Sequence, residues 1–270
     1  MPEFEGKVAI VTGAGRLRGI GRGAAIAFAK LGADVVVTGT GRDPARYPDD
    51  EKAVGWRDIE STAEQVRALG TRALPLVVDV SNEDQVKSMM ARTVEEFGRV
   101  DFLVNNAAFA RGPDRVPVFD LDADILQKVL DVKINGGVFC SREAAKAMIE
   151  QGEGGGIVFV SSGAGKQGGA NALAYNAACF AQVGMTQSLA QELGPYGINV
   201  NCVCPGAVDT SRVDDIGRGE KWKNMEAQIP IRRAGTDEEV GGVTAYLCTE
   251  AASWIHGQSI NLNGGTMMAP

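Results

Sequence analysis

The sequence of 270 residues contains one histidine, His256, and five cysteines. A catalytic triad or a metal cluster built on histidine is therefore not expected. The cysteines show no zinc-ligand spacing, and Cys202 and Cys204, which are separated by one valine, would share one face of a strand. An odd number of cysteines and the lack of a signal peptide predict reduced thiols and a cytoplasmic location.

The sequence also lacks an excess of positive charge and a long apolar run. Its 27 Lys and Arg residues against 34 Asp and Glu give a net charge of −7. Nucleic-acid binding needs a clustered basic face, and a membrane helix needs about 20 consecutive apolar residues. We therefore expect neither a nucleic-acid nor a membrane partner. An anionic cofactor stays possible, because it needs only local donors and a helix N-terminus.

Short β-branched runs alternate with longer amphipathic segments along the chain. The length favours one domain over residues 1–270. The predicted strands are Lys7–Thr12, Asp34–Thr38, Ala73–Val80, Asp101–Asn105, Gly156–Ser161, Ile198–Val203 and Gln258–Leu262. The predicted helices are Gly19–Leu31, Ile59–Leu69, Asn82–Phe97 capped by Ser81 or Asn82, Asp122–Ile149, Ala174–Leu193, and Thr236–Thr249 with a capping box to Glu239. This alternation predicts an α/β fold, a Rossmann-type doubly wound parallel sheet of about seven strands. Ligands of such sheets bind at the carboxyl ends of the strands.

Two segments do not fit a plain strand-helix unit. Gly39–Arg57 is long, polar and rich in turn residues, and Val208–Ala234 carries Trp222, Met225 and Ile229. Loops of this length inside a compact domain are usually functional or mobile. The second segment, at about residues 208–234, is the predicted substrate loop.

A glycine-rich turn follows the first predicted strand and reads Thr-Gly-Ala-Gly-Arg-Leu-Arg-Gly-Ile-Gly from Thr12 to Gly21. Glycines allow a tight turn and a close approach of the backbone to a pyrophosphate. The helix that begins near Gly19 offers unpaired N–H groups to the phosphates. Its place between the first strand and the first helix favours nucleotide binding over a merely flexible turn.

Four further motifs follow in order along the chain. Asn-Asn-Ala-Ala at 105–108 follows the fourth strand, Ser162 lies thirteen residues before Tyr175, Pro205–Gly206 precedes Thr210, and the dipeptides Gly257–Gln258 and Gly264–Gly265 lie near the C-terminus. From about Gly6 to Gly265 the sequence resembles the short-chain dehydrogenase/reductase family. The glycine turn departs from the family pattern by two extra residues before Gly19.

The resemblance implies hydride transfer between a nicotinamide and a ketone or secondary alcohol. Tyr175 would be the acid for reduction and the base for oxidation, and Ser162 would donate a hydrogen bond to the substrate oxygen. The ordinary tyrosine pKa of about 10 is too high for a good base, and a cation at about 4–6 Å lowers it by about 1–3 units. In the family a lysine four residues after the tyrosine supplies that cation and holds the nicotinamide ribose.

The sequence has Cys179 where the family has this lysine, and Lys133 where the family has a helix asparagine. Three interpretations stay open: Lys133 replaces the missing charge, or the chain binds cofactor with little turnover, or Cys179 is an introduced or fortuitous substitution. We favour the first, and take Lys133 as the third catalytic residue. The alternative for Lys133 is an ordinary lysine exposed to solvent, and the alternative for Cys179 is a small buried residue that only fills space.

The predicted cofactor is NADP(H), with NAD(H) as the alternative. The second strand ends at Gly39 and shows no carboxylate for the ribose hydroxyls, while Arg42, Arg18 or Arg16 could pair with a 2′-phosphate. Asp79 is expected near the adenine by resemblance. The predicted cofactor contacts are Gly13, Gly15, Arg18, Gly19, Ile20, Arg42, Asp79, Val80, Asn105, Ala107, Tyr175, Cys179, Pro205, Gly206, Val208 and Thr210.

The substrate wall is expected from Phe109–Arg111, Ala164–Leu173, Gly206–Val208, Trp222 and Met225, a mixture that suits a moderately hydrophobic ketone or alcohol. Arg111 could bind an anion, although a solvent-facing arginine is the favoured interpretation. By resemblance we expect a homotetramer with the helices Asp122–Ile149 and Ala174–Leu193 at one interface. The predicted function is a ketone reductase or alcohol dehydrogenase; the alternative is a cofactor-binding protein without redox turnover.

Overall fold

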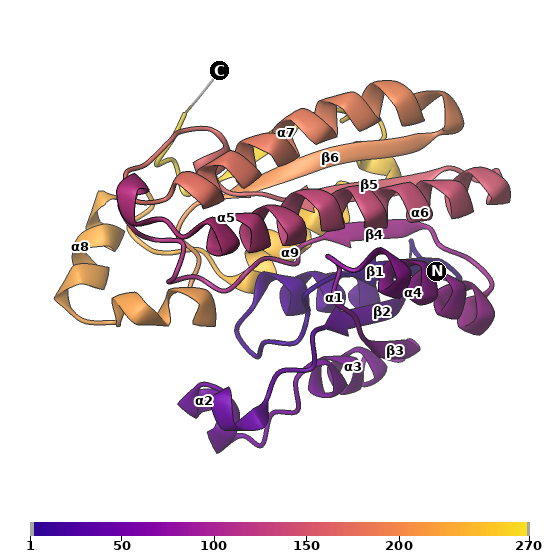
Figure 1. Cartoon of the computed structure of the whole chain (residues 1–270). Helices are drawn as coiled ribbons and strands as arrows, with labels where there is room; N and C mark the ends of the chain where they lie inside the picture. The colour runs from indigo at the N-terminus through magenta and orange to yellow at the C-terminus, as the bar shows by residue number, and fades with distance from the viewer. Residues whose placement is uncertain (1–2, 269–270) are drawn as a thin grey trace.

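A seven-stranded parallel sheet forms the centre of the molecule in the computed structural model, which describes residues 3–268. The strand order is β3-β2-β1-β4-β5-β6-β7 (Figure 1). The strands are β1 (Val8–Val11), β2 (Asp34–Gly39), β3 (Ala73–Val77), β4 (Phe102–Asn105), β5 (Gly155–Val160), β6 (Ile198–Pro205) and β7 (Ser259–Leu262). The order reverses between β1 and β4, which is where such sheets open a crevice for ligands. The predicted fold class is confirmed.

Helices cover both faces of this sheet (Figure 1). One face carries α1 (Ile20–Lys30), α3 (Ile59–Arg67) and α9 (Asp237–Tyr246), and the other carries α4 (Glu83–Phe97), α6 (Gly136–Gln151) and α7 (Leu173–Leu193). Within β1, Ala9 and Val11 join the first hydrophobic cluster and Val8 and Ile10 the second. Burial on both sides explains why the strands are apolar throughout.

The predicted helix starts agree with the capping groups. Asn82 caps α4 by accepting from the N–H groups of Asp84 and Gln85, and Thr236 and Glu239 form the capping box of α9. Most predicted bounds differ from the structure by one or two residues. The third strand is an exception, because it ends at Val77 rather than at Val80.

The long helix predicted over Asp122–Ile149 is divided into three parts. α5 (Ala123–Leu130) and α6 are joined by a π-helical turn, η3 (Asp131–Asn135). A π turn inserts an extra residue into the helical repeat and is often found at functional sites. Lys133 lies in this turn and is buried, with 3% of its surface exposed.

The sequence predicts that the two long segments are loops, but both contain helices. Gly39–Arg57 includes η1 (Pro44–Arg46) and α2 (Asp49–Ala53), and Val208–Ala234 includes η6 (Ser211–Ile216) and α8 (Glu220–Gln228). The other short helices are η2 (Val118–Asp120), η4 (Gly163–Gly165), η5 (Gly194–Tyr196) and η7 (Glu250–Ala252). Trp222 is buried in α8 beneath Arg218, whose guanidinium carbon lies 4.1 Å from the indole centroid. The apolar residues of this segment therefore anchor it to the body of the protein.

Within residues 3–268 no helix has the length and apolar character that crossing a membrane requires. The same residues hold no group of three or more His, Cys, Asp or Glu side chains that could bind a metal ion. The five cysteines are free thiols, four of them buried.

Candidate active site

The glycine turn is held against the end of β4 by side-chain hydrogen bonds. Asn106 Nδ2 donates to the carbonyls of Thr12 (2.7 Å) and Gly13 (2.9 Å), and the Asn106 and Ala107 N–H groups donate to Thr12 Oγ1. Gly13 has a φ of +68°, and a Cβ there would lie 2.9 Å from the Ala107 Cα. Only glycine fits this position, so the motif after β4 sets the shape of the turn.

The N-terminus of α1 is open for an anion. Its cap residue, Gly19, provides no side-chain hydrogen bond, and the first turn of the helix holds no acidic residue. The free N–H groups and the helix dipole face a cleft of about 550 Å³. Of the predicted contacts, the cleft is lined by Gly13, Gly15, Arg18, Gly19, Ile20, Arg42, Asp79, Val80, Ala107, Phe109, Arg111 and Thr210. Its size and its phosphate-type cradle fit a dinucleotide.

The expectation that no carboxylate stands near the end of β2 is wrong. Asp58, which directly precedes α3, lines the cleft with its carboxylate against Gly15, where a Cβ would come within 1.9 Å of Oδ1. Its φ of 55° is unusual for a residue other than glycine, and such strain clusters at functional sites. Arg42 donates to Asp58 Oδ1 (2.8 Å), Glu51 Oε2 (2.9 Å) and the Gly15 carbonyl (2.9 Å). Each of the three guanidinium nitrogens of Arg42 therefore already donates a hydrogen bond within the chain.

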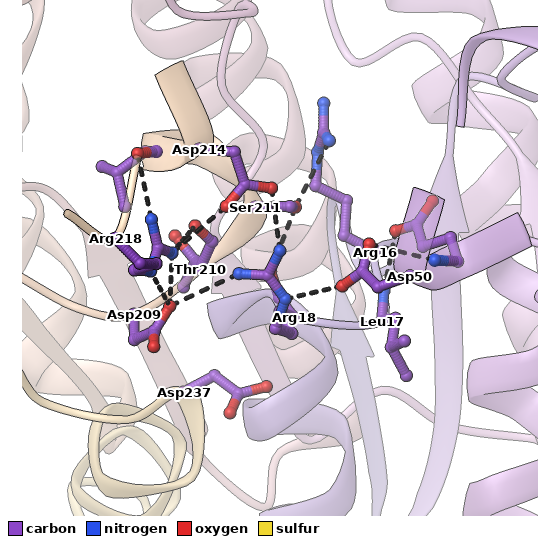
Figure 2. A network of polar contacts seen from close by, with 12 residues as sticks. Arg16, Leu17, Arg18, Asp50, Asp209, Thr210, Ser211, Asp214, Arg218 and Asp237 are labelled. Atoms are coloured by element: carbon purple, nitrogen blue, oxygen red, sulfur yellow. Dashed lines mark hydrogen bonds and ion pairs between the residues drawn. The ribbon is translucent and has the colours of Figure 1, made fainter. Parts of the chain in front are cut away.

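Arg18 is likewise bound to carboxylates of the chain, as Figure 2 shows. Its guanidinium donates to Asp50 Oδ2 (2.7 Å), Asp214 Oδ2 (2.8 Å) and Asp209 Oδ1 (3.3 Å). Its carbonyl accepts from the N–H (3.0 Å) and the hydroxyl (3.2 Å) of Ser211. Arg18 thus ties the glycine turn to α2 and to η6, which is a structural task rather than the phosphate contact suggested by the sequence.

Tyr175 lies near the start of α7 and is half-buried. Burial raises the pKa of its phenol, and the neighbouring Cys179 thiol acts in the same direction. Arg212, Ser162 and Arg115 oppose this rise in the pKa. Ser162, at the end of β5, also accepts from the Ala164 N–H at 3.2 Å. The structure therefore brings together the serine and the tyrosine that the thirteen-residue spacing pairs.

Lys133 points into the protein, so the alternative of a solvated lysine is wrong. Its Nζ donates to the Val160 carbonyl (3.2 Å) and lies 5.9 Å from the Tyr175 ring centroid. Burial lowers the pKa of its ammonium, and the Cys179 thiol opposes that change. Cys179 is itself fully buried, and its carbonyl accepts from Ser161 Oγ at 3.0 Å. A thiol thus occupies the place beside the phenol, and a lysine from η3 brings a cation near it.

Two arginines that the sequence did not single out also face Tyr175. The guanidinium carbon of Arg115 lies 4.1 Å from the ring centroid and that of Arg212 lies 5.3 Å from it. Arg212 also lines the dinucleotide cleft. Both come from loop-rich segments without periodicity, so no pattern in the sequence could place them at this ring.

Several predicted site residues lie outside the cleft wall. Asn105 donates to Ser141 Oγ (2.9 Å) and lines a small cavity together with Lys133, and Val208 lines a separate cavity of about 270 Å³ beside β7. Trp222 is covered by Arg218. The other predicted contacts that do not line the cleft are Tyr175, Cys179, Pro205, Gly206 and Met225.

The sheet order and the cradle at its switch point define a dinucleotide-binding protein of the Rossmann type. A family model described as enoyl-(acyl carrier protein) reductase matches residues 13–267. The chain is 35% identical to a short chain dehydrogenase/reductase of Aspergillus oryzae, over 97% of this chain and 95% of that protein. It is also 35% identical to an L-rhamnose 1-dehydrogenase (NAD(P)(+)) of Azotobacter vinelandii, over 96% of each.

Solved structures agree with these sequence matches. A short-chain type dehydrogenase/reductase from Mycobacterium marinum superposes with a TM-score of 0.81 at 30% identity, covering 99% of this chain and 97% of that one. A mutant short-chain dehydrogenase/reductase of Serratia marcescens gives a TM-score of 0.83 at 31% identity, with coverage of 98% and 99%. The chain belongs to the short-chain dehydrogenase/reductase family and is an NAD(P)-dependent dehydrogenase/reductase.

Proposed function

We propose that this enzyme interconverts a ketone and a secondary alcohol, with Tyr175 as the group that exchanges the proton. The observation that carries the proposal is the environment of the phenol, which lies beside Ser162 and is faced by Lys133, Arg115 and Arg212. Arg212 and Arg115 oppose the rise in the pKa of the phenol that burial causes, which helps the phenol to give up and regain a proton.

The chain's own residues would divide the work as follows. In reduction the phenol of Tyr175 donates a proton to the oxygen of the substrate, and in oxidation its phenolate removes one. Ser162 donates a hydrogen bond to the same oxygen and so orients it. Gly13 and the N–H groups at the start of α1 bind the pyrophosphate of the cofactor. A bound nicotinamide would supply or accept the hydride.

Lys133 would replace the charge that the family's lysine supplies. Its ammonium is fixed by the Val160 carbonyl and lies close enough to the ring to favour the phenolate. Cys179, which is buried, would serve only to fill space. The cysteine at this position, where the family has a lysine, is also the observation that favours the second candidate function, a cofactor-binding protein with little redox turnover.

We also propose that the cofactor is NAD(H) rather than the NADP(H) expected from the sequence. Asp58 stands on the cleft wall beside Gly15, where a carboxylate would accept from ribose hydroxyls and repel a 2′-phosphate. Arg42 is already bound to two carboxylates. Arg16 donates to Ser211 Oγ (3.3 Å) and lines the cleft, so it can still reach the pyrophosphate.

Two measurements on the purified protein test the proposal. The first is cofactor affinity for NADH and NADPH, followed by fluorescence; the second is the change in absorbance of the reduced nicotinamide with a panel of ketones and secondary alcohols. We expect binding of NADH and turnover of at least one carbonyl. Binding without turnover across the panel would favour the second candidate function. Failure to bind either cofactor would contradict both.

We propose a homotetramer in which α6 and α7 contribute to one interface. Both helices expose apolar side chains, Val138 and Ile149 on α6 and Leu173 and Phe180 on α7, each between 39% and 50% exposed. Exposed apolar side chains that gather on neighbouring helices are typical of an interface. Light scattering of the purified chain measures its mass in solution. The cytoplasmic location stays a prediction.

A further inference from the structure

Arg115 and Arg212 both bring positive charge to the ring of Tyr175. Arg115 comes from the loop between β4 and η2, and Arg212 from η6. Their guanidinium carbons lie 4.1 Å and 5.3 Å from the centroid of the Tyr175 ring. We call these two residues the arginine pair.

The arginine pair has few acceptors within the described residues. The Arg115 side chain is 20% exposed, and its Nε is buried without a hydrogen-bond partner. Asp114 Oδ1 lies 3.7 Å from this Nε and already accepts from the Gly112 N–H (3.2 Å). Arg212 donates to the Phe109 carbonyl (2.7 Å) and forms no ion pair within residues 3–268. Within the described residues Arg115 thus has only the 3.7 Å contact with Asp114 to match its charge, and Arg212 has no carboxylate, so an external anion is expected to complete the pair.

Neighbouring arginines show that the same region does provide carboxylates. Arg111 pairs with Asp215, and Arg218 pairs with Asp209 and Asp214. These ion pairs tie the segment that holds η6 to its surroundings. Acidic residues are therefore not scarce in this region. These carboxylates lie near the arginine pair but are bound to other arginines.

We propose that the arginine pair binds a carboxylate carried by the substrate, which would make the substrate an oxo acid or a hydroxy acid. The inference rests on the proposed function, because it places the carboxylate beside the phenol that exchanges the proton. Guanidinium groups bind carboxylates through two parallel hydrogen bonds. Both guanidinium groups lie close to the Tyr175 ring, so the carboxylate would be one or two carbons from the reacting carbon.

The cofactor is a weaker candidate for the anion. Its pyrophosphate is expected at the glycine turn and the N-terminus of α1. Arg115 does not line that cleft, whereas Arg212 lies on its wall. An anion that contacts both arginines therefore lies on the Tyr175 side of the cleft, where the substrate binds.

The test compares 2- and 3-hydroxy acids of three to eight carbons with their methyl esters, which are neutral and close in shape. We expect a higher kcat/KM for at least one acid than for its ester. Arg115→Gln should lower the ratio of kcat/KM for the acid over that for the ester by about 10- to 100-fold, the usual effect of losing a charge-assisted hydrogen bond, in addition to any loss that both substrates share because Arg115 lies beside the phenol. Arg115→Lys should retain part of the preference, and Arg212→Gln should act in the same direction as Arg115→Gln.

Arg72→Gln is the matched control. Arg72 also stacks on an aromatic ring, with its guanidinium carbon 4.6 Å from the Phe97 centroid, and also pairs with an aspartate, Asp34. Because Asp34 begins β2, this contact lies at the opposite end of the strands from the crevice. The control should leave acids and esters unchanged. Equal losses of kcat/KM for acid and ester in Arg115→Gln would overturn the proposal, because they would show that the arginines act only on the pKa of the Tyr175 phenol.

Calorimetric binding of the same acids to the protein saturated with NAD⁺ separates this proposal from the proposed function. Binding that weakens in Arg115→Gln, without any turnover, would retain the anion site and reject the reaction. Turnover of neutral alcohols with no acid bound or preferred would retain the reaction and reject the anion site. If no acid binds and no alcohol is turned over, both are rejected.

Discussion

Arginines on the two sides of the crevice have different surroundings. Beside the glycine turn, Arg42 and Arg18 are each bound to two or three carboxylates of the chain. Beside Tyr175, Arg115 and Arg212 stack on the phenol and meet few acceptors. The difference indicates that guanidinium charge fully matched inside the chain fixes the backbone, whereas charge only partly matched beside a titratable phenol can act on a ligand.

The largest expected effect is on the substrate side. Tyr175→Phe removes the proton-exchanging group and retains the ring on which the arginines stack. We expect kcat/KM to fall by about 10²- to 10⁴-fold, the usual contribution of general acid–base catalysis. The dissociation constant for NADH, measured by fluorescence, should change little. Retention of most of the activity would contradict the assignment of Tyr175.

On the cofactor side the expected effect is on stability. Glu51 is fully buried, and it accepts from the Leu17 N–H (3.0 Å) and from Arg42 (2.9 Å). Glu51→Gln leaves the Arg42 charge without one partner, which should cost about 3–5 kcal/mol of unfolding free energy. Chemical denaturation measures this loss, and Asp49→Asn, an exposed change in the same helix, is the control. Equal stability of the two variants would show that the buried pair is not structural.

The third prediction concerns the cation behind the phenol. Lys133→Met retains much of the side-chain volume and removes the charge, so the pKa of Tyr175 should rise. Oxidation at neutral pH should slow by about 10- to 100-fold, since a nearby cation shifts such a pKa by about 1–2 units. The rate should recover at higher pH. If instead Cys179→Lys gains activity and Lys133→Met changes nothing, the site is disabled rather than rearranged.

The smallest expected effect is on the choice of cofactor. Asp58→Asn removes the negative charge that faces the ribose and frees one donor of Arg42. We expect the ratio of kcat/KM for NADP⁺ over NAD⁺ to rise by about tenfold, the effect of relieving one like-charge contact. Asp43→Asn, which changes an exposed residue of the same segment, should leave the ratio as it is. A native enzyme that already prefers NADP⁺ would contradict the role given to Asp58.

Local signals in the sequence predict most of the fold. The apolar strands, the glycine turn and the capping box at Thr236 each depend on residues close together in the chain, and the structure confirms all three. The pairing of Ser162 with Tyr175 was also predictable, because it follows from the spacing of the family motif.

The missed features depend on long-range packing. Asp58 lies nineteen residues after Gly39 in sequence (58 − 39) and comes back to the end of β2 only because the segment with α2 folds over the glycine turn. Arg115 and Arg212 meet at one ring from segments 97 residues apart (212 − 115). The expectation of NADP(H) has the same weakness. It rests on the absence of a carboxylate close to Gly39 in sequence, whereas the fold brings Asp58 there.

The central claim is that the phenol of Tyr175 exchanges the proton, and its pH dependence tests this most directly. Because burial raises the pKa of the phenol above its ordinary value, little phenolate exists near neutral pH. Single-turnover oxidation should therefore rise about tenfold per pH unit from about pH 7 to about pH 9, while reduction, which needs the protonated phenol, stays flat. The rise should disappear in Tyr175→Phe. A rate that is independent of pH, or a rise that persists in Tyr175→Phe, would contradict the account.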